Sequence, residues 1–115
     1  MSTKLERLLD PESIIVFDGA MGTMLYSKGV FINQCYDELN LRAPDMVREI
    51  HKKYVDAGAQ VIETNSFGAN RLKLTQHGLE KQVNELNRAA AQVARDAAGQ
   101  LPRLAELADE RARAP

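Results

Sequence analysis

The chain has 115 residues, with 44% hydrophobic and 27% charged side chains, which is the composition of a globular domain that can bury one core. Its formal net charge of −1 excludes a general attraction to nucleic acid or to anionic membrane surfaces, and it holds no apolar run of about 18 residues that would span a membrane. The single cysteine, Cys35, excludes an internal disulfide, and the polar N-terminus is unlike a signal peptide. We therefore expect a cytoplasmic protein with no nucleic-acid or membrane partner.

The first predicted element is a strand over residues 14–17. Its side chains are all apolar and mostly β-branched, and they lie between Pro11 and Gly19. This pattern is typical of a strand that is buried on both faces in a parallel sheet. Residues 18–23 follow as a glycine-containing loop whose backbone can approach a ligand closely. Residues 27–42 show no clear periodicity and are predicted to form a loop.

A helix is predicted to begin at Pro44 and Asp45. Proline suits the first helical turn, and an acidic side chain there complements the helix dipole. Apolar side chains recur at helical spacing at Val47, Ile50, Tyr54 and Val55, and Gly58 stands where a C-terminal cap belongs. The remaining predicted elements are a strand over residues 60–64, a polar loop over 65–70, a short helical turn over 72–77 and a strongly amphipathic helix over 79–98.

The order of these elements predicts the fold class. Strands that alternate with helices form a parallel sheet, so we predict an α/β fold in which residues 14–17 and 61–64 form adjacent parallel strands. After Gly99 the character changes, because residues 100–115 hold no β-branched side chain and the expected third strand is missing. We therefore divide the chain into a domain over residues 1–99 and a tail over residues 100–115.

The candidate binding residues lie where the two predicted strands end. Ligands of parallel α/β proteins bind at that edge of the sheet, where Asp18 would lie beside the polar end of the second strand, Glu63, Thr64 and Asn65. The carboxylate of Asp18 can hold an ammonium group, and the backbone N–H groups of residues 19–21 can hold a carboxylate, so together they suit an amino acid. The alternative is that Asp18 only closes an Asp-Gly turn and that Thr64 and Asn65 bond within their own loop.

Three further side chains are weaker candidates. We interpret Cys35 as an inert loop thiol, since no histidine lies near it in sequence. His51 lies beside Lys52 and Lys53, on what we predict to be a solvated helix face. His77 is interpreted as a helix-terminal side chain that interacts with the helix dipole.

Three segments together resemble one known family. They are residues 17–25 (Phe-Asp-Gly-Ala-Met-Gly-Thr-Met-Leu), residues 54–59, and residues 61–70 (Val-Ile-Glu-Thr-Asn-Ser-Phe-Gly-Ala-Asn). In this order they look like the N-terminal signature of the homocysteine S-methyltransferases. The resemblance extends to the homocysteine-binding module of cobalamin-dependent methionine synthase and of bifunctional proteins that fuse it to a methylenetetrahydrofolate reductase. It implies a (β/α)8 TIM barrel that methylates the thiolate of homocysteine to give methionine.

The resemblance also implies a metal and a set of site residues. In the family, zinc held by three cysteine thiolates binds the homocysteine sulfur, and metal ligation removes the proton of a thiol whose pKa is ~8.5. Asp18 matches the aspartate that helps to bind the amino-acid end of homocysteine. Thr64 and Asn65 match the polar end of the second strand. The implied substrate-binding residues are Asp18, Gly19, Ala20, Met21, Thr64 and Asn65.

The departures from the family decide what we expect of this chain. The zinc cysteines of the family lie in Gly-Cys and Gly-Gly-Cys-Cys contexts that this sequence does not reach, and Cys35 corresponds to none of them. A complete barrel needs ~250 residues, of which this chain supplies about two of the eight βα units. We expect an N-terminal fragment that is inactive alone and binds no zinc, with homocysteine as the substrate of the complete domain. Two alternatives stay open: a non-catalytic small-molecule-binding or docking module, and a non-functional gene remnant.

Overall fold

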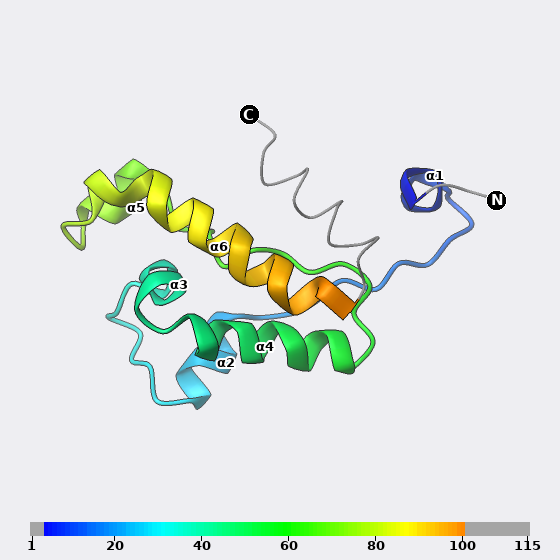
Figure 1. The fold of residues 1–115 in the computed structure, drawn as a ribbon, viewed down its shortest axis with the longest axis horizontal. Helices are drawn as coiled ribbons and strands as arrows, with labels where there is room; N and C mark the ends of the chain where they lie inside the picture. The colour runs from blue at the N-terminus through cyan, green and yellow to red at the C-terminus, as the bar shows by residue number, and fades with distance from the viewer. Residues whose placement is uncertain (1–3, 101–115) are drawn as a thin grey trace.

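The computed structural model describes residues 4–100 and shows a helical chain with extended connections (Figure 1). The α-helices are α1 (Lys4–Leu9), α2 (Gly22–Ser27), α3 (Leu39–Arg42), α4 (Pro44–Asp56), α5 (Arg71–Thr75) and α6 (Val83–Ala97). Short 3-10 helices lie at Tyr36–Glu38 (η1), Glu80–Gln82 (η2) and Ala98–Gln100 (η3). The two long helices α4 and α6 pack against each other, while α1 stands apart from them at one end of the molecule (Figure 1).

The predicted parallel sheet is wrong for the part of the chain that the structure describes, and the α/β fold class is wrong with it. No strand forms there, and the two apolar runs meet only at one isolated parallel bridge, between Phe17 and Val61. The backbone N–H groups of Gln60 and Val61 donate to the carbonyl oxygen of Val16 at 2.7 and 3.3 Å, and the N–H of Asp18 donates to that of Val61 at 3.0 Å. The βα barrel units implied by the resemblance are therefore not formed by the described residues, which are mainly helical.

The physical reason is that the first run, residues 14–17, lacks covering neighbours in the described chain, whereas Val61 and Ile62 of the second run are buried. A strand rich in β-branched side chains is stable in a parallel sheet when other elements cover both of its faces. Ile14 is 87% exposed and Val16 is 51% exposed, so side chains that were predicted to be buried face solvent instead. The two segments nevertheless run parallel where they touch, and this short contact positions the loops that follow them.

The predicted helices are confirmed with small changes of boundary. α4 begins at Pro44, and Gly58 follows its end with a φ of +113°, as a C-terminal glycine does. The helix predicted over residues 79–98 is divided into η2 and α6, and the turn predicted over 72–77 corresponds to α5. The region 27–42 was predicted as a loop but contains η1 and α3, which are too short for periodicity to reveal.

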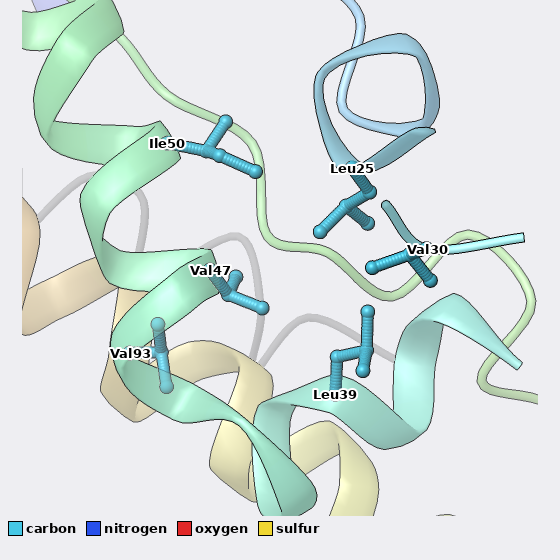
Figure 2. Close-up of a cluster of buried hydrophobic side chains, with 6 residues drawn as sticks. All are labelled: Leu25, Val30, Leu39, Val47, Ile50 and Val93. Carbon is cyan, nitrogen blue, oxygen red and sulfur yellow. The ribbon is translucent and has the colours of Figure 1, made fainter. Parts of the chain in front are cut away.

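The core forms where α2, α3, α4 and α6 meet. Figure 2 shows six buried side chains from these helices and from the connection after α2: Leu25, Val30, Leu39, Val47, Ile50 and Val93. Full burial of one aliphatic side chain of this size contributes about 1.5–3 kcal/mol. A second cluster consists mostly of small side chains, which let α6 approach the segment after α4: Ala59, Ile62, Ala94, Ala97 and Ala98. Since Ile62 belongs to this cluster, α6 also fixes the segment that leads to Thr64.

His51 lies in the interior and not on a solvated face, so that prediction is wrong. Its side chain is fully buried, and neither ring nitrogen has a hydrogen-bond partner among the described residues. Burial lowers the pKa of the imidazole to about 4, because the charged form would lose its hydration. The adjacent Lys52 and Lys53 are exposed, and so is His77. The lysines identified the outer face of α4, but His51 lies on the inner one.

None of the helices described has the length and hydropathy needed to cross a bilayer. Of the predicted tail over residues 100–115, only the backbone of Gln100 is described, at the end of η3. Ala98 still belongs to the second core cluster. The boundary at residue 99 stays a prediction.

Candidate functional site

Asp18 lies directly after the bridge between the two extended segments. Its backbone N–H donates to the carbonyl oxygen of Val61 at 3.0 Å, and its carboxylate Oδ2 accepts the backbone N–H of Glu63 at 3.1 Å. The backbone and the side chain of one residue thus join both segments. Thr64 follows Glu63 in the chain, so the structure brings Asp18 and Thr64 to the same end of the two segments.

The carboxylate of Asp18 is partly buried, and its pKa is raised above the ordinary value. Burial is the main cause, because it removes water from the charged form. The negative charge of Glu63 acts in the same direction, while the hydrogen bond from the Glu63 N–H partly offsets both. A poorly solvated carboxylate gains more from a cationic partner than a fully hydrated one does. The site therefore favours a ligand that brings a positive charge to Asp18.

The loop from Gly19 to Met21 is held by Tyr54 of α4. The Tyr54 hydroxyl donates to the carbonyl oxygen of Ala20 at 2.7 Å. The ring lies so close to Gly19 that a Cβ there would be 3.2 Å from Cε1 of Tyr54. The backbone N–H groups of Gly19, Ala20 and Met21 donate to no other residue of the described range. They form a short run of donors beside a carboxylate, an arrangement that can bind an anion.

Sequence reasoning assigned Tyr54 only to the apolar face of α4 and missed its contact with this loop. A buried or partly buried tyrosine hydroxyl needs a hydrogen-bond partner, and Tyr54 is the tyrosine in an otherwise aliphatic stripe. That chemistry was the available signal. The partner, the carbonyl oxygen of Ala20, could not be read from the spacing, because it lies far away in the sequence.

Thr64 and Asn65 have different surroundings. Oγ1 of Thr64 lies 2.5 Å from Oγ of Ser66, so the two hydroxyl groups share a hydrogen bond within the loop. The side-chain amide of Asn65 is buried and donates to the carbonyl oxygen of Tyr36 at 2.8 Å. Thr64 therefore remains next to Glu63, whose backbone binds Asp18, whereas the side-chain amide of Asn65 is directed toward η1.

The described residues do not fit the zinc site that the resemblance implies. Within residues 4–100, no group of three histidine, cysteine, aspartate or glutamate side chains is placed to hold a metal ion. The thiol of Cys35 is buried, 3.8 Å from Oδ1 of Asp37, and burial is the main cause that raises its pKa. A raised pKa disfavours the thiolate form that zinc requires. A site with three thiolates cannot be built from this one cysteine.

A known protein family matches the part of the chain that contains the segments 17–25, 54–59 and 61–70. The sequence model of the family described as homocysteine S-methyltransferase matches residues 15–109, which include both extended segments and the loops that follow them. The chain belongs to the homocysteine S-methyltransferase family. The resemblance carried by residues 17–25, 54–59 and 61–70 is thereby confirmed.

Two methionine synthases, from Mycobacterium tuberculosis and Mycobacterium leprae, are each 32% identical to this chain over 96 residues. Each match covers 78% of this chain but 8% of the relative. The homocysteine methyltransferase MmuM from Escherichia coli superposes in its oxidized form with a TM-score of 0.73 and 30% identity, and in its metallated form with a TM-score of 0.72 and 31% identity. These superpositions cover 87% and 95% of this chain and 35% and 38% of MmuM. The chain therefore corresponds to a part of each of these proteins.

Proposed function

We propose that this chain provides the amino-acid-binding loops of a homocysteine S-methyltransferase and does not transfer a methyl group by itself. The complete family domain would methylate the thiolate of homocysteine to give methionine. The observation that carries the proposal is the partly buried carboxylate of Asp18 beside three backbone N–H groups that bond no other described residue. An α-amino acid carries the complementary pair of charges on a single carbon atom.

Each element of the site has a role in this proposal. Asp18 holds the ammonium group through Oδ1, because Oδ2 already accepts a backbone N–H. The N–H groups of residues 19–21 hold the carboxylate, and Tyr54 keeps their loop in place. Thr64, in the second segment, lines the site beside Asp18. Asn65 does not touch the ligand and holds the loop that carries Thr64 through its bond to Tyr36. These contacts use both charged groups of the amino acid and leave its thiol free.

Zinc, where the complete domain binds it, would supply a thiolate at neutral pH by displacing the thiol proton. The donor groups of the described residues do not fit that ion, so no step through zinc is assigned to them. Homocysteine is accordingly the small-molecule partner of the complete domain. A substrate that reacts through a free thiol suits a reducing compartment, which supports a cytoplasmic location.

A non-catalytic amino-acid-binding module is the second candidate function. It is favoured by the same site, together with the lack of a set of metal ligands among residues 4–100. The two candidates agree on the ligand. They differ on whether further parts of a methyltransferase domain act on the bound amino acid.

Titration of the 15N-labelled chain with L-homocysteine under reducing conditions tests the proposed binding. We expect the amide signals of residues 18–21 and 63–64 to shift in a saturable way. L-Methionine and L-homoserine keep the ammonium and carboxylate groups and should shift the same signals. 1-Butanethiol, which keeps only the thiol, should leave them unchanged. If L-homocysteine shifts none of these signals at millimolar concentration, the proposed function is wrong.

A further inference from the structure

The segment from Cys35 to Asn40 contacts both loops of the proposed binding site. On one side, the ring of Tyr36 lies against Gly22 at the end of the Asp18 loop, where a Cβ would be 3.3 Å from Cε2 of the ring. On the other side, hydrogen bonds join the segment to the loop after Glu63. One short segment thus lies between two loops that are far apart in the sequence.

The side chains of Asn40 and Asn65 make reciprocal contacts across this junction. Nδ2 of Asn40 donates to the carbonyl oxygen of Asn65 at 2.7 Å and to that of Asp37 at 2.8 Å. In return, Nδ2 of Asn65 donates to the carbonyl oxygen of Tyr36 at 2.8 Å. Asn40 is only 2% exposed, so its donors cannot be replaced by water without opening the structure. Buried amide contacts of this kind specify one arrangement of the two segments.

A third bond fixes the far end of the same loop. Oδ2 of Asp37 accepts the backbone N–H of Gly68 at 3.0 Å. A Cβ on Gly68 would lie 2.8 Å from Oδ1 of Asp37, closer than real Cβ contacts, so the carboxylate can approach only because residue 68 is glycine. Asp37 and Asn40 together therefore hold the loop over residues 64–68 at both ends.

We propose that Asn40 and Asp37 are positioning residues for amino-acid binding. They set the loop that carries Thr64 against the loop that carries Asp18, without touching the ligand. Among the described residues, their side-chain hydrogen bonds go to this loop, to η1 and to Cys35, and none goes to α4 or α6, so their effect should fall on the site more than on the helical core. The inference rests on the proposed function, since it concerns the affinity of the same site.

Substitutions at both residues test the inference in the full chain. Asn40→Ala removes both donated bonds, and Asn40→Asp keeps the shape but turns an oxygen toward two carbonyl oxygens. Each should weaken L-homocysteine binding about tenfold, the effect of leaving the buried carbonyl of Asn65, in the loop, without its donor. Asp37→Ala should do the same, whereas Asp37→Asn keeps an acceptor for the Gly68 N–H and should restore most of the affinity. Val93→Ala is the matched control, because it creates a cavity in the core cluster of Figure 2. It should lower the free energy of unfolding without changing the dissociation constant for L-homocysteine.

Amide hydrogen exchange separates this inference from the proposed function. In Asn40→Ala, exchange at Ser66, Gly68 and Ala69 should accelerate about tenfold while α6 is unchanged. If the unmodified chain fails to bind L-homocysteine, the proposed function is wrong. Faster exchange of the loop amides in Asn40→Ala would still support the role of Asn40 in positioning the loop, and unchanged exchange there would refute it. If the chain binds and Asn40→Ala leaves affinity unchanged, or if Val93→Ala weakens binding as strongly, the positioning role is refuted.

Discussion

The hydroxyl of Tyr54 on α4 donates a hydrogen bond to the carbonyl oxygen of Ala20 at 2.7 Å, across 34 positions of the sequence. Val47 and Ile50 on the same helix are fully buried in the core. A rotation or shift of α4 would therefore move the loop that presents the N–H groups of residues 19–21. The bond makes the geometry of the loop over residues 19–21 depend on the position of α4.

The first prediction concerns Tyr54→Phe. The ring stays against Gly19, but the loop loses its hydrogen bond to α4. We expect the free energy of unfolding to fall by about 0.5–1.5 kcal/mol, the net contribution of one such bond, and L-homocysteine to bind several-fold more weakly. Urea denaturation and NMR titration measure the two effects. Tyr26→Phe, at an exposed tyrosine of α2, is the matched control and should change neither quantity.

The second prediction concerns the charge of Asp18. Asp18→Asn keeps an oxygen that accepts the Glu63 N–H, so the loop should keep its place, but the charge that would hold the ammonium group is gone. A charge-assisted contact contributes roughly 1.5–3 kcal/mol, so affinity for L-homocysteine should fall about ten- to a hundredfold. Asp56→Asn, at an exposed aspartate of α4, should leave it unchanged. An affinity that is the same in Asp18→Asn and in the unmodified chain would exclude this role of Asp18.

The same substitution should not destabilise the fold at neutral pH. Burial raises the pKa of Asp18 in the folded chain above its unfolded value, so at pH 7 the folded state carries a charge that it solvates less well than the unfolded state does. This penalty is present above the folded pKa and is relieved as the pH falls through it. Asp18→Asn removes the penalty, and its free energy of unfolding at pH 7 should equal or exceed that of the unmodified chain. A clear loss of stability would show that the carboxylate is needed for folding.

Sequence patterns located the long helices α4 and α6, but they missed the short helices α2 and α3 and did not determine the partners of the strands. Periodicity found α4 because Val47 and Ile50 recur on one face, and a helix makes its hydrogen bonds within itself. The run Ile14–Phe17 shows the composition of a buried strand, but a strand needs neighbouring strands, and these can come from any other segment of the chain. The described residues provide one such contact, at Val61, and so the predicted sheet is reduced to a bridge.

Some residues of the candidate site could be predicted from the sequence, and others could not. The position of Asp18 after the first apolar run was enough to place it next to the second, because the two runs touch in parallel. Asn40 and Asp37 could not be found, since they lie in a region without periodicity and act through backbone atoms of a distant loop. Polar contacts to the backbone leave no pattern of spacing in the sequence.

The third prediction concerns His51 and acid stability. Its pKa is lowered from 6.5 to about 4 in the folded chain. Between these two pH values the histidine is protonated in the unfolded state and neutral in the folded state. Stability should therefore be lost as the pH falls from about 6.5 to about 4, by up to about 3 kcal/mol. His51→Leu removes this titration and should flatten the profile of stability against pH over that range. His77→Gln, at an exposed histidine, serves as the control, and a profile that is equally steep in His51→Leu would assign the acid sensitivity to other groups.

The fourth prediction concerns zinc. The purified chain should retain no stoichiometric zinc after dialysis against a weak chelator, because a tight site needs three or four well-placed ligands and the described residues offer no such group. Metal analysis of the dialysed protein checks this. Cys35→Ser should give the same result as the unmodified chain. Zinc that stays bound in the unmodified chain and is lost in Cys35→Ser would reveal a metal site that includes this thiol.

The last prediction is that the isolated chain binds homocysteine but does not methylate it. Binding requires only the charge pair around Asp18, whereas methyl transfer also requires the homocysteine thiol to be converted into a thiolate and a methyl donor to be held in line with it. A thiol with a pKa of ~8.5 is mostly protonated at neutral pH, and no described group is placed to hold a metal that would remove the proton. Incubation of the chain with L-homocysteine and either S-methylmethionine or methyltetrahydrofolate with cobalamin should therefore give no methionine above the background without protein. The full-length methionine synthase of Mycobacterium tuberculosis, assayed in parallel, controls for the assay. Methionine formed by the chain at a rate proportional to its concentration, and abolished in Asp18→Asn, would show that these residues contain a complete active site.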